Sequence, residues 1–156
     1  ELAYPGQIHN IVVNRVANHY DLYSEETIYY RHGGWGRADL ISWSGEVWDV
    51  KRDKPWHIEA GKKQVEKYTN NIWKRYPNAN LRAGGIIYTE SFVETINIDT
   101  YYITYRDAGN GVIAYDYYKI TNWNEVVEYA KSVGITALAG LALLMSYGQV
   151  GLEYFY

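Results

Sequence analysis

The chain has 156 residues, a formal net charge of −3 and no cysteine. This length suffices for one domain with a core and is too short for two comfortable ones, so we expect a single domain over residues 1–156. The lack of cysteine excludes disulfides and thiolate zinc sites, so any metal must be held by oxygen and imidazole ligands, which favours Mg²⁺ or Mn²⁺. The acidic balance gives no overall attraction to phosphate, so binding of nucleic acid would need a local basic patch.

The first half of the chain predicts a helix, three strands and a second helix. Apolar residues recur at helical spacing over residues 7–20 and again over residues 57–76, which is typical of amphipathic helices. Runs rich in β-branched and aromatic residues predict three strands between these helices, over residues 27–32, 37–43 and 46–52. A short apolar strand is expected after the second helix, over residues 84–90.

The second half of the chain predicts a β-hairpin and further helices. Residues 100–107 and 111–120 read as its two strands, and Asn122 is placed to cap a short helix. The apolar stretch of residues 133–147 is shorter than the ~20 residues that a bilayer span needs, so a buried terminal helix is expected rather than a stable membrane span. These elements make up a C-terminal extension, residues 91–156.

Three ionisable residues interrupt the two central strands, where apolar residues would be expected. A two-residue turn between the strands would pair Asp39 with Val50 and point it away from Asp49. A three-residue loop that ends in a left-handed Gly45 would instead place Asp39 directly opposite Asp49, with Lys51 on the same face. Both registers are open to the sequence, and Gly45 fits the second.

In the second register the two carboxylates would repel each other and would be costly to bury without a positive charge. A divalent cation would supply that charge, and Lys51 would supply part of it. The trio of Asp39, Asp49 and Lys51 is therefore either a structural salt bridge or a metal-dependent catalytic site. The combination of spacing and glycine-set register favours the catalytic site.

The pattern of these residues resembles a known catalytic motif. Asp39, followed on the next strand by Asp49, Val50 and Lys51, is similar to the core of the PD-(D/E)XK nucleases, in which an aspartate precedes a (D/E)-x-K element. The resemblance covers roughly residues 5–90. It implies an α/β fold of the restriction-endonuclease type, with an αβββαβ core.

The resemblance also implies roles for residues on the two helices. Gln64 and Tyr68 match the Q-x-x-x-Y element of the RecB-type branch and would be catalytic, and His9 lies where that branch carries a metal-binding histidine. The two aspartates, with His9 and the Val50 carbonyl, would hold Mg²⁺ or Mn²⁺ against the scissile phosphate. Lys51 would orient or deprotonate the attacking water.

Several of these residues also have simpler interpretations. His9 could be a polar residue on the helix surface, and Tyr68 could be an ordinary core residue. Glu25 or Glu26 is an alternative acidic ligand. The basic residues near the motif would contact a nucleic-acid backbone or form a solvated face: Arg52, Lys62 and Lys63. Two tryptophans flank the motif and are expected to pack, with base stacking as the alternative: Trp35 and Trp56.

The expected function is that of a metal-dependent endonuclease, with DNA as the substrate and transfer RNA as the alternative. The segments PGQIHN and WGRADL resemble nuclease domains at the C-termini of bacterial polymorphic and contact-dependent inhibition toxins. This resemblance implies the C-terminal part of a larger secreted or surface-delivered bacterial protein that acts in the target-cell cytoplasm. A cognate immunity protein would then inhibit it. A non-catalytic, tyrosine-rich binding module is the alternative from another class.

Overall fold

The computed structural model describes residues 5–30, 33–70 and 81–121. The helix predicted from Asn122 and the apolar stretch of residues 133–147 therefore lie outside the described residues. Among the residues that are described, no helix is long and apolar enough to cross a bilayer.

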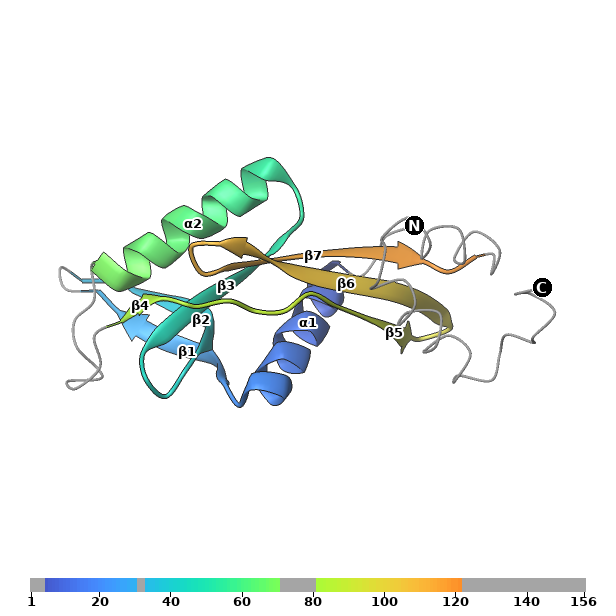
Figure 1. Ribbon diagram of the computed structural model, residues 1–156, viewed down its shortest axis with the longest axis horizontal. Coiled ribbons are helices and arrows are strands. Elements are labelled where there is room, and N and C mark those ends of the chain that lie inside the picture. The colour runs from blue at the N-terminus through green and yellow to red at the C-terminus, as the bar shows by residue number, and fades with distance from the viewer. Residues whose placement is uncertain (1–4, 31–32, 71–80, 122–156) are drawn as a thin grey trace. The chain divides into compact units, whose positions relative to one another are not determined.

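The described part of the chain is a mixed α/β fold built mostly from strands (Figure 1). Its two helices are α1 (Pro5–Tyr20) and α2 (Pro55–Asn70). Its strands are β1 (Tyr23–Tyr29), β2 (Trp35–Ile41), β3 (Glu46–Arg52), β4 (Arg82–Ala83), β5 (Glu90–Ile96), β6 (Asp99–Gly109) and β7 (Val112–Lys119). The hydrogen-bonded strand order is β1-β2-β3-β7-β6-β5, and β4 pairs with β3 off this path.

Most of the predicted elements are confirmed, with shifted ends. Both helices form, β3 has the predicted bounds, and β1 and β2 each begin earlier in the chain than expected. The predicted hairpin forms as β6 and β7, with its turn at Asn110 and Gly111, both of which have positive φ. β5 was not foreseen from the sequence.

The strand predicted over residues 84–90 is wrong. The chain leaves β4 at Ala83, and no strand begins again until β5. Side chains take the backbone amides of this stretch: Asp107 Oδ2 accepts from Ile87 N at 2.9 Å, and the Tyr20 hydroxyl accepts from Tyr88 N at 2.9 Å. These contacts from distant parts of the chain replace the hydrogen bonds of a strand ladder. The apolar composition of the stretch therefore did not predict its secondary structure correctly.

The chain divides into two compact units. The first comprises Glu1–Tyr88 with Arg106–Tyr115, and the second comprises Thr89–Tyr105 with Asp116–Tyr156. In the second unit β5 pairs antiparallel with β6, from Glu90 opposite Tyr105 to Ile96 opposite Asp99. Its buried side chains are largely aromatic, and they include Phe92, Tyr101, Tyr102 and Tyr105.

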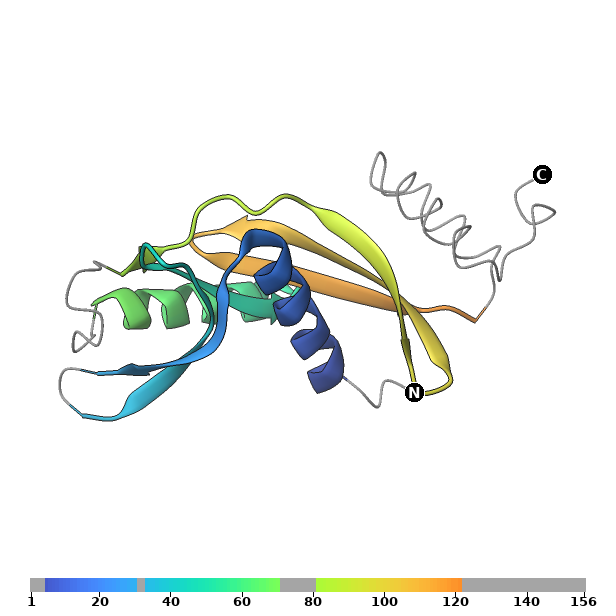
Figure 2. The same cartoon turned by 90° about the horizontal axis from the view of Figure 1, so that it is seen from below.

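The first unit holds all of the candidate site residues. Its helices α1 and α2 lie on opposite sides of β3, as the two views show (Figures 1 and 2). Helix α1 buries Ile8, Val12 and Val16, which recur at helical spacing as the sequence predicts. Helix α2 buries Val65 and Tyr68, so β3 is covered on both faces.

The loop between β2 and β3 sets the register that matters for the site. Ile41 pairs with Val47 and Leu40 with Trp48, and the ladder closes at the loop where Ser42 N donates to Glu46 O at 2.8 Å. The loop therefore has three residues and ends in Gly45, whose φ is 96°. The second of the two registers considered above is confirmed, and it places residue 39 opposite residue 49.

Gly45→Ala should destabilise the protein, because a Cβ is disfavoured at positive φ. We predict a loss of about 1–2 kcal/mol in the free energy of unfolding, measured by chemical denaturation. Gly6→Ala is the control, because Gly6 lies in a helix, where alanine is not disfavoured, and a Cβ on it meets nothing within 4 Å. Equal stability of Gly45→Ala and the parent would show that this glycine does not set the loop.

Candidate active site

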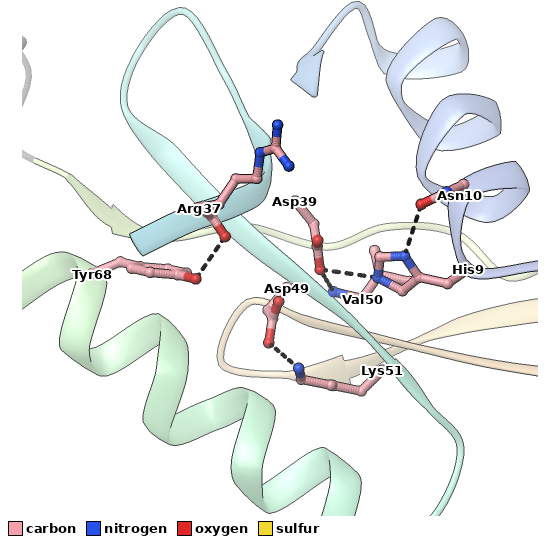
Figure 3. A network of polar contacts seen from close by, with 8 residues as sticks. All are labelled: His9, Asn10, Arg37, Asp39, Asp49, Val50, Lys51 and Tyr68. Carbon is pink, nitrogen blue, oxygen red and sulfur yellow. Dashed lines mark hydrogen bonds and ion pairs between the residues drawn. The ribbon is translucent and has the colours of Figure 1, made fainter. Parts of the chain in front are cut away.

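The ladder between β2 and β3 stops just before the two aspartates meet. The ladder has only two residue pairs, Leu40 with Trp48 and Ile41 with Val47. If the ladder continued by one further hydrogen-bonded pair, the Val50 amide would donate to a backbone carbonyl of β2. Instead Val50 N donates to Asp39 Oδ2 at 2.7 Å (Figure 3). A carboxylate thus stands where a backbone acceptor would otherwise lie.

The pairing of β1 with β2 is interrupted at the same level. Ser24 pairs with Leu40 and Glu26 with Ala38, but Glu25 and Asp39 between them are not paired. Glu25 has a φ of 56°, in the left-handed region that a side chain rarely adopts. Asp39 therefore lies at a local break in both of its neighbouring ladders.

Asp49 is the more deeply buried of the two aspartates. Its side chain is 4% exposed, whereas that of Asp39 is 17% exposed. Lys51 Nζ lies 3.3 Å from Asp49 Oδ2, which is close enough for an ion pair. The approach is not aligned as a hydrogen bond, so Asp49 Oδ2 has no hydrogen-bond partner within the described residues.

The pKa values of the two carboxylates are shifted in opposite directions. Burial, and then the neighbouring Asp39, raise the pKa of Asp49 to about 8. Burial also works to raise the pKa of Asp39, but hydrogen bonds with His9, Asp49 and the Val50 amide hold that pKa below its ordinary value. At neutral pH the pair therefore carries a proton on Asp49 and a negative charge on Asp39.

His9 reaches the pair from α1. Its Nε2 lies 3.4 Å from Asp39 Oδ2, and its Nδ1 lies 3.3 Å from the side-chain oxygen of Asn10. The hydrogen bond to Asp39 raises the pKa of His9, against the effect of burial. The structure therefore brings His9, whose side chain is 27% exposed, next to Asp39, and its role as a metal ligand stays a prediction.

Lys51 is positioned by β3 and by a glycine on α2. Asp49 and Lys51 pair with Val112 and Ala114 of the parallel strand β7, so this part of β3 is held by a regular ladder. A Cβ on Gly61 would lie 2.9 Å from Lys51 Cγ, so glycine at that position leaves room for the lysine stem.

Gln64 and Tyr68 lie on α2, and they do not reach the carboxylates through a hydrogen bond. The Tyr68 hydroxyl donates to the Arg37 carbonyl at 2.6 Å, and the residue is 4% exposed. The Gln64 side chain hydrogen-bonds to Tyr68 and to Tyr30. Burial, followed by the nearby Asp49, raises the pKa of Tyr68 to about 12, so the hydroxyl stays protonated.

The other candidate residues lie nearer the surface. Lys62 pairs with Glu59 at 3.7 Å, and Lys63 is exposed. Arg52 is half-buried at the end of β3. Glu25, one of the two alternative acidic ligands, lies 3.8 Å from Arg37.

The expectation that two flanking tryptophans would pack is wrong. Trp35 is 65% exposed and Trp56 is 66% exposed. Trp56 follows the first residue of α2, and Trp35 begins β2 next to a glycine turn, so neither lies at a position that faces the core. Their exposure leaves base stacking open as a role.

Sequence reasoning missed three residues that surround the site: Asn10, Tyr30 and Gly36. The Tyr30 ring stacks on that of Tyr68, with centroids 6.5 Å apart and planes 14° apart. Gly36 lies beneath these rings, and a Cβ there would collide with the Tyr30 hydroxyl. The isolated glycine inside a strand was the one available signal, because it indicates close approach of another group.

No three His, Asp or Glu side chains in the described ranges converge as a complete metal cage. Mg²⁺ does not require one, because it usually keeps several waters and uses one or two carboxylates with substrate phosphates. Asp39 and Asp49 offer oxygen ligands, and Asp49 Oδ2 is buried without a hydrogen-bond partner in this part of the chain. By chemistry and by burial, these residues fit a hard divalent cation.

Comparison with family models, with curated proteins and with solved structures found no match to this chain.

The raised pKa of Asp49 predicts that the metal-free protein loses stability as pH rises. The ordinary pKa of Asp49 is 3.8, so between that pH and about 8 the folded state keeps a proton that the unfolded state gives up. The free energy of unfolding falls with rising pH across this window. The raised pKa of His9 acts in the same direction as pH passes its ordinary 6.5.

We therefore predict that the Tm, measured by calorimetry in chelator, decreases from about pH 5 to about pH 8. Asp49→Asn, which cannot ionise, should make this decrease shallower. Asp99→Asn is the matched control, because Asp99 also lies 3.3 Å from a lysine but is 27% exposed rather than buried. The same slope in Asp49→Asn and the parent would contradict a proton held on Asp49.

Proposed function

We propose that this protein is a metal-dependent nuclease that hydrolyses phosphodiester bonds. The observation that carries the proposal is the pair of carboxylates opposite each other at an open ladder, with Lys51 3.3 Å from Asp49. Two such acids cannot both ionise beside each other without a positive partner. A divalent cation that also binds a substrate phosphate would be such a partner.

Asp39 and Asp49 would hold Mg²⁺ or Mn²⁺, with the Val50 carbonyl and His9 as further ligands. His9 would have to release Asp39 to do so, because its Nε2 now faces Asp39 Oδ2. The metal would supply Lewis-acid activation of a phosphate oxygen and of water.

Lys51 would act on the attacking water and on the charge that develops on the phosphate. Its stem runs past Gly61, and its ammonium group lies beside Asp49 while its side chain is 33% exposed. It can thus be reached from solvent and still be oriented by a buried acid. Such a donor stabilises charge in the transition state more than in the ground state, which is the requirement for catalysis.

We propose that the core has the restriction-endonuclease-like topology of the PD-(D/E)XK nucleases. The element order α1, β1, β2, β3, α2 and β4 supports this, as does the place of Asp39 on β2 and of Asp49 and Lys51 on β3. In this proposal Gln64 and Tyr68 form the motif on the helix that follows β3.

DNA is the proposed substrate and transfer RNA is the alternative, because the resemblance of the motif to toxin nucleases points more often to DNA. Arg52, Lys62 and Lys63 would contact the nucleic-acid backbone, where contacts carry no sequence information. In the same proposal the chain is the toxin part of a larger bacterial protein delivered into a target cell, and a cognate immunity protein inhibits it.

A binding module without catalysis is the second candidate, and exposed aromatic residues favour it. Trp43 is 87% exposed at the tip of the β2–β3 loop, and Trp35 and Trp56 are exposed as well. Exposed tryptophans are frequent anchors of binding surfaces. This candidate requires no metal, so metal dependence separates it from the nuclease.

Asp49→Asn and Lys51→Gln should each lower cleavage by about 100 to 1000-fold, since each removes one preorganised group of the site. Cleavage is followed on gels with plasmid DNA and with transfer RNA, in Mg²⁺, in Mn²⁺ and in chelator. Parent activity should vanish in chelator.

Lys119→Gln is the matched control for Lys51→Gln. Lys119 also lies 3.3 Å from an aspartate, and its side chain is 31% exposed, close to the 33% of Lys51. This variant should cleave like the parent. Full activity of Lys51→Gln or of Asp49→Asn would contradict the nuclease proposal, and so would parent activity that persists in chelator.

A further inference from the structure

The position of Asp39 is not fixed by a regular backbone ladder to β3. The β2–β3 ladder ends at Leu40, the residue that follows Asp39 in the chain. The distance between the two strands that carry the aspartates therefore depends on other contacts at that level. One is the bond from Val50 N to the Asp39 carboxylate, at 2.7 Å. Another is the bond from the Tyr68 hydroxyl to the Arg37 carbonyl, at 2.6 Å, two residues before Asp39 (Figure 3).

The Tyr68 hydroxyl is itself held by a group that we call the aromatic clamp, which consists of Tyr30, Gln64, Tyr68 and Gly36. The rings of Tyr30 and Tyr68 are nearly parallel, with planes 14° apart, and Gln64 hydrogen-bonds to both residues. Gly36 lies against both rings, and a Cβ there would be 2.7 Å from the Tyr68 ring. The clamp therefore fixes β2 against α2 immediately before Arg37.

The ammonium group of Lys67 adds a further contact to the Tyr30 ring of the aromatic clamp. Lys67 Nζ lies 4.7 Å from the centroid of the Tyr30 ring, within the range of a cation–π contact. Lys67 is one residue before Tyr68 on α2, so the same turn of the helix supplies both groups that contact the Tyr30 ring. The Tyr30 ring, at the residue that follows β1, is thereby held against α2.

We infer that Tyr68 is a positioning residue, whose hydroxyl, oriented by the aromatic clamp, sets where Asp39 lies opposite Asp49. Tyr68 is 4% exposed and its hydroxyl is engaged by backbone, so it acts through β2 and does not touch substrate. The inference rests on the proposed function in one respect, namely that Asp39 and Asp49 hold the metal.

The test compares two tyrosines whose hydroxyls both bond to backbone. Tyr68→Phe keeps the ring stack and removes only the hydroxyl. Tyr20→Phe is the matched control, because the Tyr20 hydroxyl bonds to Tyr88 N at 2.9 Å and is outside the site. Three quantities are measured: the exchange rate of the Val50 amide by NMR, the affinity for Mn²⁺ by calorimetry, and kcat and KM for nucleic acid.

In Tyr68→Phe the Val50 amide should exchange about fivefold faster than in the parent, because one hydrogen bond that holds its acceptor strand is lost. Mn²⁺ should bind about fivefold more weakly for the same reason, and kcat should fall while KM is unchanged. Tyr30→Phe should change all three in the same direction and by less. Tyr20→Phe should change none of them.

The inference is overturned if Tyr68→Phe matches Tyr20→Phe in all three measurements. It is also overturned if exchange speeds up equally at every amide of the first unit, since the hydroxyl would then serve only global stability. If the parent cleaves no nucleic acid but Val50 exchange and Mn²⁺ affinity change as expected, the proposed function fails and the positioning role stands.

Discussion

The repulsion between two carboxylates placed opposite each other in the sheet is the constraint on which the rest of the site depends. In a poorly solvated setting, two ionised carboxylates side by side cost several kcal/mol if nothing offsets them. The chain offsets part of this with a proton on Asp49, with the Val50 amide and His9 at Asp39, and with Lys51 beside Asp49. None of these contacts satisfies Asp49 Oδ2 with a hydrogen bond.

The two edges of β3 are paired differently at the level of the aspartates. On one edge β3 pairs with β7 from Asp49 to Arg52, so a regular ladder holds the part of the strand that carries Asp49 and Lys51. On the other edge the ladder ends before Asp39, which frees the Val50 amide for a carboxylate. Asp39 is thus the member of the pair whose position depends on side chains, and α1 and α2 each supply one of them.

The sequence predicts what is local in this site. Gly45 signals the loop that places Asp39 opposite Asp49, because a left-handed residue and loop length together fix the register. It does not predict the break in the ladder at Asp39, nor the stack of Tyr30 on Tyr68, which joins residues far apart in the chain. The strand expected over residues 84–90 failed for a related reason, since distant side chains take its amides.

Titration of the parent protein with Mn²⁺ near neutral pH, by calorimetry in two buffers of different ionisation enthalpy, tests whether a divalent cation binds between Asp39 and Asp49. A cation that binds between Asp39 and Asp49 must displace the proton on Asp49, so we predict uptake at one site with release of about one proton. Asp49→Asn should abolish the proton release. No uptake of Mn²⁺, with or without nucleic acid present, would contradict the account.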